Sequence, residues 1–226
     1  MIENSNIGVN YIKERMEKAR ELLKKKYCMK FDVLDYLGQS SMKEYYEVSA
    51  VSSEHPDMVF DAAINIDYSG FSDSYAEKMV SKRFSDIVAK NLDAVKGYVY
   101  IYSEPLIRHI TLTSADIPAG DLADVPGGSI MTVRVFMCIE EKSAEKIYVS
   151  YMKMFDSLEK NSGNLYVYIT SEEMLRDVQK YVESNITLYH DFFEMVRDNL
   201  VITDRYENGV PQITKKSFIE KMGKCL

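Results

Sequence analysis

Apolar residues recur at three- and four-residue steps over residues 9–27, which is the spacing of one face of an α-helix. The apolar positions are Val9, Ile12, Met16, Ala19, Leu23 and Tyr27. Charged residues occupy the opposite face, as expected of a helix side that faces solvent. We expect this helix to end at Lys24-Lys25-Lys26, where cations complement the helix dipole. A local basic patch is the alternative interpretation of these lysines.

A period of two residues follows and predicts strands. The three segments with this alternation are 29–37, 44–51 and 58–67. Turn residues separate them at 38–41 and 54–57, and such short connections favour antiparallel neighbours. The sequence therefore predicts a three-stranded meander after the N-terminal helix.

A second helix is predicted over 74–92, because Ser74 and Glu77 have the spacing of a capping box. Residues 68–73 before it are interpreted as a loop, and a short strand is expected over 98–102. The pattern then predicts further elements in the second half. They are a strand at 130–139, a helix at 143–158, a strand at 165–169, a helical region from 170 to 199 broken near 184–185, a hairpin over 201–213 and a short helix after Thr214. Thr170 and Glu173 have capping-box spacing, and Asn208-Gly209 is a favoured hairpin turn.

Three prolines and three glycines fall within residues 103–128, which makes this segment the best candidate for a linker. Residues 107–112 within it could still form an edge strand. We therefore expect a helix-plus-meander unit over 1–105, a linker over 106–128 and a second α+β unit over 129–226. The two units are also compatible with packing as one domain. The predicted fold class is α+β, with two strand–helix–strand units followed by a helix, a hairpin and a short helix.

The two halves share a short sequence. Residues 98–104 and 166–172 are identical at six of seven positions, and each segment follows a strand and a helix. Duplication is one interpretation, and coincidence is the other, because Tyr-Val-Tyr-Ile is a good strand sequence in any fold. We expect both strands to lie inside a sheet, with the valines and isoleucines on one face. The other face then carries Tyr98, Tyr100, Tyr166 and Tyr168, which are the candidate binding-face residues.

Composition excludes several classes of function. The net charge of −7 and the pI of about 5.1 disfavour binding to a phosphate backbone. The three cysteines lie far apart and lack the spacing of a zinc site, so buried free thiols are expected, with a single disulfide as the alternative. No apolar stretch approaches the roughly 18 to 20 residues that cross a bilayer. The chain is then either cytosolic or normally carried by an upstream anchor.

Catalytic motifs are missing as well. The sequence contains no G-x-S-x-G, P-loop or G-x-G-x-x-G pattern, and Asp67 to Asp73 does not fit a calcium-binding EF-hand loop. His55 is expected in a turn, and His109 in a strand-like or linker segment. His190 and Glu194 lie one helical turn apart, a spacing that suits a metal, but a second helical histidine is missing. We therefore predict no cofactor and no metal.

The N-terminal half resembles small uncharacterised proteins of Gram-positive gut bacteria. The resemblance rests on a helix that ends in Lys-Lys-Lys-Tyr at 24–27, Phe-Asp-Val at 31–33, Pro-Asp-Met-Val-Phe-Asp-Ala at 56–62 and the helix at 74–92. Those proteins are usually tethered outside the cell membrane by an N-terminal segment, which this chain lacks. The resemblance implies a cell-surface location, and it transfers no functional residue.

Together these observations predict a non-catalytic surface or assembly module that binds a protein. A cytosolic enzyme or small-ligand-binding protein without a recognisable motif is the alternative, and it requires a pocket with convergent polar groups. A regulatory domain that dimerises through its sheet edges is a third interpretation.

Overall fold

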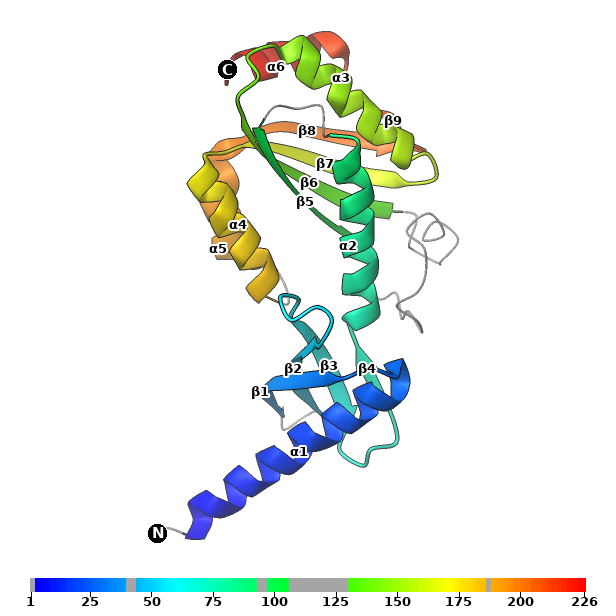
Figure 1. Ribbon diagram of the computed structural model, residues 1–226, viewed down its shortest axis with the longest axis vertical. Coiled ribbons are helices and arrows are strands. Elements are labelled where there is room, and N and C mark those ends of the chain that lie inside the picture. The colour runs from blue at the N-terminus through cyan, green and yellow to red at the C-terminus, as the bar shows by residue number, and fades with distance from the viewer. Residues whose placement is uncertain (1–2, 40–43, 93–96, 106–129, 186–187) are drawn as a thin grey trace. The chain divides into compact units, whose positions relative to one another are not determined.

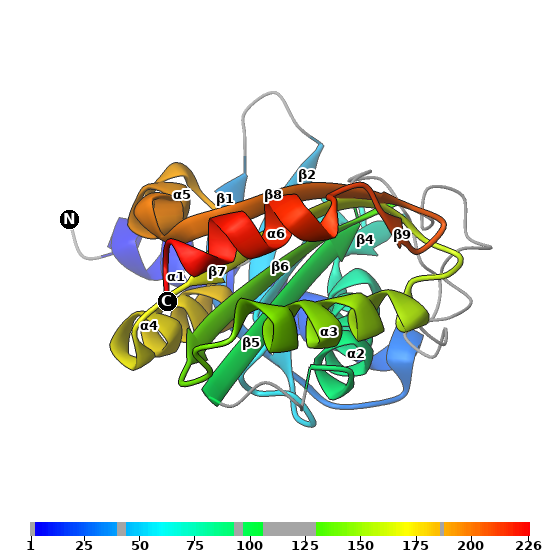
Figure 2. The ribbon, with the colours of Figure 1, turned by 90° about the horizontal axis from the view of Figure 1, so that it is seen from above.

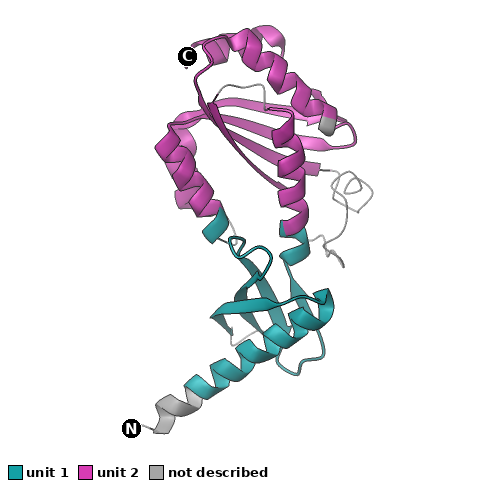
Figure 3. Cartoon of the chain, viewed as in Figure 1, with its two compact units in different colours: residues 1–78, 113–115, 183–186 teal, residues 79–112, 116–182, 187–226 magenta. Residues whose placement is uncertain are grey.

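The computed structural model is an α+β protein with two separate β-sheets (Figure 1). It describes residues 3–39, 44–92, 97–105, 130–185 and 188–226. The chain divides into two compact units, and the division falls inside a helix, after Lys78 (Figure 3). The predicted linker at 106–128, with its edge strand and His109, lies outside the described residues and stays a prediction.

The first unit contains α1 (Glu3–Tyr27) and a four-stranded antiparallel sheet in the order β1-β2-β3-β4. The strands are β1 (Phe31–Gln39), β2 (Tyr45–Ser52), β3 (Phe60–Asn65) and β4 (Phe71–Asp73). The predicted meander is therefore confirmed, but the prediction of a loop over 68–73 was wrong for its last three residues. Phe71–Asp73 pairs with Ala62–Ile64 of β3, and three residues are too few to show a periodicity.

Aromatic rings fill the centre of the first unit. Phe31, Phe60 and Tyr75 have ring centroids 5.1 to 5.7 Å apart. The helix α1 covers this core through buried Ala19 and Leu23. Its earlier apolar positions, predicted to share the same face, are exposed at Val9 and Ile12 because the first turns of α1 extend beyond the sheet (Figure 1).

The second unit contains a five-stranded sheet in the order β5-β6-β7-β8-β9. Its elements, with α2 leading in from the first unit, are α2 (Tyr75–Lys90), β5 (Gly97–Pro105), β6 (Ile130–Ile139), α3 (Ala144–Met154), η2 (Phe155–Ser157), β7 (Ser162–Ile169), α4 (Glu172–Ser184), α5 (His190–Val196), η3 (Arg197–Asn199), β8 (Leu200–Glu207), β9 (Val210–Pro211) and α6 (Lys215–Gly223). Of the strand pairs that the structure describes in this sheet, only β6–β7 is parallel, and α3 connects these two strands. The second predicted strand–helix–strand unit is thus confirmed.

The prediction that the first strand–helix–strand unit contributes both of its strands to one sheet was wrong. Its two strands, β3 and β5, belong to different sheets. Among the described strands β5 also lies at the edge of its sheet, whereas both similar segments, 98–104 and 166–172, were expected inside a sheet. Strand β5 runs antiparallel to β6, while β7 runs parallel to it on the other side. The two similar sequences therefore occupy different positions in the sheet. The alternation that they share does not determine which strand each one pairs with.

The five-stranded sheet separates the side chains as the alternation predicts. Val99 and Ile101 pair with Met137 and Val135 on one face. On this face α3 and α6 pack side by side (Figure 2), and the hydroxyl of Tyr151 on α3 donates a 2.6 Å hydrogen bond to Asp204 of β8. The opposite face, which we call the tyrosine face, is partly covered by α4 and α5.

The predicted caps and turns agree with the structure at α6 and at the Asn208-Gly209 hairpin, and differ at α4. Thr214 caps α6 by accepting a hydrogen bond from the amide of Ser217, as expected. Asn208 and Gly209 both have positive φ, as a two-residue hairpin turn requires. The cap of α4 is Ser171 rather than Thr170, because the amide of Met174 donates to the Ser171 hydroxyl at 3.1 Å. Thr170 instead continues the pairing of β7 with β6, and its amide donates to the carbonyl of Met137.

The predicted cap of α2 and the expected cysteine environment also differ from the structure. The Ser74 hydroxyl hydrogen-bonds with Asp61 of β3. All three cysteines are free, but Cys28 and Cys225 are exposed and Cys138 is half-buried, so the expectation of burial was wrong. Across the described helices, none is both long and apolar enough to cross a membrane.

Candidate functional site

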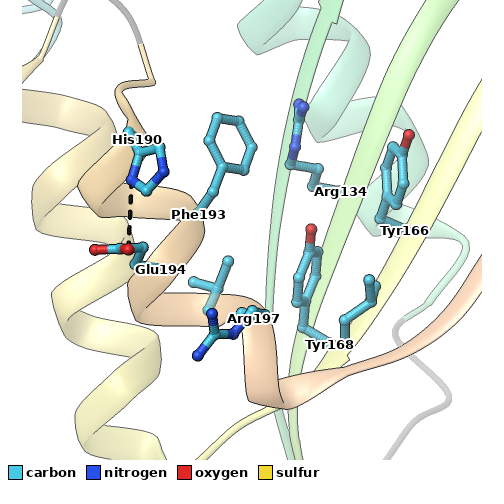
Figure 4. A pocket seen from close by; sticks show the side chains of 9 residues that line it. Arg134, Tyr166, Tyr168, His190, Phe193, Glu194 and Arg197 are labelled. Carbon is cyan, nitrogen blue, oxygen red and sulfur yellow. Dashed lines mark ion pairs between the residues drawn. The ribbon is translucent and has the colours of Figure 1, made fainter.

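A pocket of about 430 Å³ opens on the tyrosine face of the second unit (Figure 4). Strands β6, β7 and β8 form one wall, and α5 with η3 forms the other. The lining residues are Arg134, Tyr166, Tyr168, His190, Phe193, Glu194, Val196, Arg197 and Leu200. The volume lies at the lower end of the range of about 300 to 1,000 Å³ that is usual for ligand pockets.

Arg134 is the central charged residue of the sheet wall. It lies in β6 directly beside Tyr166 of β7, and its side chain is only 9% exposed. Its Nη1 donates to Oε1 of Glu104 on β5 at 2.6 Å, and the hydroxyl of Tyr102 donates to the other carboxylate oxygen at 3.2 Å. The ion pair explains how a guanidinium is accommodated inside an otherwise apolar strand.

Aromatic rings surround the guanidinium. Its central carbon lies 5.5 to 6.0 Å from the ring centroids of Tyr102, Tyr166 and Phe193. These distances fall within the range of cation–π attraction. The Nε atom of Arg134 is fully buried and has no hydrogen-bond acceptor among the described residues. The pocket wall therefore contains a positively charged group with an unused donor.

Tyr168 joins the pocket to the hydrophobic core. It is 4% exposed, and its ring stacks on Phe136 with centroids 4.6 Å apart. Burial raises the pKa of the Tyr168 hydroxyl, while the positive charge of Arg134 opposes this rise. The hydroxyl is therefore neutral at ordinary pH and available as a hydrogen-bond donor or acceptor.

The opposite wall depends on the break between α4 and α5. Phe192 and Val196 of α5 are buried against the tyrosine face, and the ring of Phe192 lies 6.1 Å from that of Phe136. This anchoring turns the intervening Phe193 toward the pocket, where it remains exposed (Figure 4). Asn199 then fixes the end of η3 by donating to the carbonyl of Ile169 at 2.9 Å.

His190 and Glu194 lie at the rim of this wall. Their Nδ1 and Oε1 atoms are 3.6 Å apart, and the His190 side chain is 85% exposed. In the described part of the chain no group of three or more histidine, cysteine, aspartate or glutamate residues is placed to hold a metal ion. Arg197, also exposed, has its Nε 3.3 Å from the carboxylate of neighbouring Asp198.

The four candidate tyrosines have different positions. Tyr166 and Tyr168 line the pocket. Tyr100 is half-buried beside Phe136, with ring centroids 6.4 Å apart. Tyr98, at 59% exposure, lies near the start of the edge strand and is not among the lining residues.

Sequence reasoning did not select Arg134, Phe193, Arg197 or Leu200 as site residues. For Arg134 a signal was available, because it is the one charged residue in the apolar strand Ile130–Ile139. A charge at such a position requires a partner. The other three residues come from α5, η3 and β8, whose exposed positions have no distinguishing sequence pattern.

A second polar cluster lies in the first unit. The buried carboxylate of Asp73 forms a 2.8 Å ion pair with Lys26 and accepts a 2.7 Å hydrogen bond from the Tyr27 hydroxyl. Glu77 lies near Asp61 and Asp73. Its burial, and secondarily repulsion from these two carboxylates, raises the pKa of Glu77 to about 7. The positive charge of Lys26 opposes this rise. Asp73 also supports the start of α2, because the amide of Tyr75 donates a 3.1 Å hydrogen bond to its Oδ1.

The fold and pocket define an α+β protein with a ligand-sized cavity beside a mixed sheet. No family model matches the sequence, and no curated protein matches it. Among solved structures, the chain is similar to a DUF5037 family protein from Ruminococcus gnavus ATCC 29149. The TM-score is 0.66 at 16% identity, over 91% of this chain and 98% of the other. This likeness establishes the fold, supports the resemblance to uncharacterised proteins of gut Firmicutes and indicates no specific function.

Proposed function

We propose that the chain is a non-catalytic binding module whose ligand enters the pocket between the tyrosine face and α5. The observation that carries the proposal is the composition of the pocket: aromatic and branched apolar side chains surround a buried arginine. Tyrosine and arginine are among the residues that contribute most to protein recognition. None of the nine described lining residues is a serine, threonine, cysteine or lysine nucleophile.

A protein segment suits this pocket as a ligand. Phe193 of α5 and Leu200 of β8 both line the pocket and are exposed, so they present apolar surface to a ligand. The cavity has room for one or two side chains of a peptide, and the charged groups at the rim, including Arg197 and Glu194, supply polar contacts around an apolar centre. This arrangement of apolar centre and polar rim is typical of protein interfaces.

Selection from a peptide display library tests the proposal. Peptides selected on the wild-type chain should bind with micromolar affinity and should lose at least tenfold in affinity for Phe193→Asp. The matched control is Val149→Asp, which places the same charge at an exposed apolar position on α3. Equal binding of the selected peptides to wild type and Phe193→Asp would contradict the proposal. So would changes in backbone amide chemical shifts, recorded as a peptide is added to the isotope-labelled chain, that fall outside β7 and α5.

A small-molecule enzyme is a second candidate, and the His190–Glu194 pair favours it. A carboxylate beside an exposed imidazole can orient the ring for proton transfer at the pocket rim. A panel of chromogenic ester, phosphate and glycoside substrates tests this alternative. Turnover that is lost in His190→Gln and retained in His55→Gln would replace the binding module by an enzyme.

We also infer a cell-surface location from the resemblance to tethered proteins of gut bacteria. The fold likeness to the Ruminococcus gnavus protein carries no information on tethering. Antibody against the chain should label intact cells of the source bacterium. Labelling that appears only after the cells are permeabilised would contradict the inferred location.

A further inference from the structure

The guanidinium of Arg134 has hydrogen-bonding capacity that the described residues do not use. A guanidinium carries five N–H donors in a planar fork. Nη1 donates to Glu104, whereas Nε has no acceptor among the described residues. A buried donor without an acceptor is unfavourable, so an acceptor at this position is strongly favoured.

The unused donor belongs to a side chain that lines the pocket. Since Nη1 is directed to Glu104, the edge that combines Nε with Nη2 is the one left for a second acceptor, and because Nε is fully buried, an acceptor from the pocket reaches it only when the flanking side chains shift. Tyr166 and Phe193 flank the guanidinium within 5.6 Å, and both also line the cavity. An acceptor there would lie between two aromatic rings, largely shielded from water.

The preference for an anionic acceptor comes from the unused donors of Arg134 and not from the net charge around the cavity. Arg134 and Arg197 are the lining cations, and Glu194 is the lining carboxylate, already 3.6 Å from His190. Glu104 and Asp198 pair with the two arginines from outside the lining. Two arginines therefore stand against three carboxylates, and an acceptor is favoured by the unused edge of the Arg134 guanidinium rather than by an excess of positive charge.

We propose that the pocket binds a carboxylate carried next to an aromatic or branched apolar group, with Arg134 as the anion receptor. This inference rests on the proposed binding function, because it names the ligand class of the same pocket. The two carboxylate oxygens match the spacing of adjacent guanidinium donors, a geometry that an ammonium group cannot provide. The apolar group lies against Phe193 and Leu200. A free peptide C-terminus and a small aromatic acid share this chemistry.

A matched pair of ligands tests the inference on the unmodified chain. N-acetylphenylalanine and N-acetylphenylalaninamide differ only in the carboxylate, and each is titrated at pH 7 into the isotope-labelled full chain while amide shifts are recorded. We expect the acid to bind about tenfold or more tightly than the amide, as a charge-assisted hydrogen bond implies. The shifts should fall on β6, β7 and α5.

Two further ligands distinguish the sources of the carboxylate. Acetyl-Ala-Ala-Phe with a free C-terminus is compared with 3-phenylpropionate, which has the same ring and no peptide. Tighter binding of the tripeptide supports the inference and indicates a chain terminus as the natural ligand. Equal or tighter binding of the small acid supports the inference and indicates a free aromatic acid.

Variants assign the preference to Arg134. Arg134→Gln removes the charge, and Arg134→Lys keeps the charge but removes the planar fork, so the second variant carries the test if the first fails to fold. Each should reduce the acid-to-amide ratio to below about threefold while thermal unfolding remains cooperative. The control Arg176→Gln removes an exposed arginine from α4 and should leave the ratio unchanged.

Three results would overturn the inference. Equal binding of acid and amide would remove the carboxylate preference but leave the proposed binding function intact. A preference that persists in both folded Arg134 variants would assign the anion to another cation. If neither ligand binds, and peptides selected on the wild-type chain bind Phe193→Asp equally well, the inference and the proposed function fail together.

Discussion

Arg134 and Glu104 form an ion pair across neighbouring strands, with 2.6 Å between Nη1 and Oε1. They are not directly opposite in the register, because Arg134 pairs with Tyr102 and Glu104 pairs with Thr132. The contact is therefore diagonal, and it directs one edge of the guanidinium toward β5. The remaining edge is what makes this residue relevant to ligand binding.

Glu104→Gln should lower the free energy of unfolding by about 1 to 2 kcal/mol, because it leaves the buried Arg134 without its counter-charge. The estimate is below that for a fully buried pair because Glu104 is partly exposed. Urea denaturation followed by circular dichroism measures the change. Glu172→Gln, which breaks an exposed pair with Arg176 on α4, should change the value by less than about 0.5 kcal/mol. Equal effects of the two substitutions would contradict the expected importance of burial.

Tyr151→Phe should destabilise the second unit by about 1 to 2 kcal/mol, because it removes a 2.6 Å hydrogen bond to the buried carboxylate of Asp204. Asp204 would retain its bonds from the amides of Arg205 and Ile213. Thermal and urea unfolding provide the measurement. Tyr98→Phe deletes an exposed hydroxyl and is the matched control. A loss no larger than that of the control would show that Asp204 does not depend on Tyr151.

Glu77 makes the stability of the first unit dependent on pH. Its pKa of about 7 in the folded chain is above the ordinary value of 4.5, so the folded state holds the proton more tightly. The free energy of unfolding should therefore fall as pH rises from about 4.5 to about 7. The unfavourable contribution is fully present above pH 7 and absent below about pH 4.5.

Glu77→Gln should remove this dependence and raise the free energy of unfolding at pH 8 by about 1 to 2 kcal/mol, a figure reduced for solvent screening of a half-buried group. Unfolding in urea at several pH values provides the test. Glu14→Gln, at an exposed position on α1, should leave the pH profile unchanged. A Glu77→Gln profile parallel to that of the wild type would refute the assignment.

Gly163→Ala should destabilise the chain by about 3 kcal/mol or more. A Cβ at this position would lie 1.8 Å from the carbonyl oxygen of Met131 on the paired strand, and the backbone φ is +154°. Gly38→Ala is the comparison, because its φ is +117° but no atom lies within 4 Å of the added carbon. Its cost should be about 1 kcal/mol. Similar losses at both glycines would contradict the role of close strand approach.

Local sequence patterns predicted much of the fold. The period of the apolar residues located the strand at 130–139 with the same bounds as β6, and the Asn208-Gly209 turn and the Thr214 cap were also correct. These features depend on residues close in sequence. The sheet in which β3 or β5 lies depends on distant partners, and alternation alone carries no such information.

The candidate site was less predictable than the fold. Alternation placed Tyr166 and Tyr168 on one face of their strand, and both line the pocket. The same argument applied equally to Tyr98, which the register places at the exposed end of an edge strand. The helix wall could not be predicted, because the position of α5 is fixed by Phe192 and Val196 against a distant strand.

Helix α5 has seven residues, which is too few for a stable helix in isolation. Its helical structure therefore depends on docking of Phe192 and Val196 on the sheet, and the cavity has its second wall only when that docking is complete. A ligand that contacts both Tyr166 and Phe193 binds the docked state in preference to the undocked one. Occupancy of the pocket and protection of the α5 amides from solvent exchange therefore report the same docking equilibrium, and both should rise together as ligand is added.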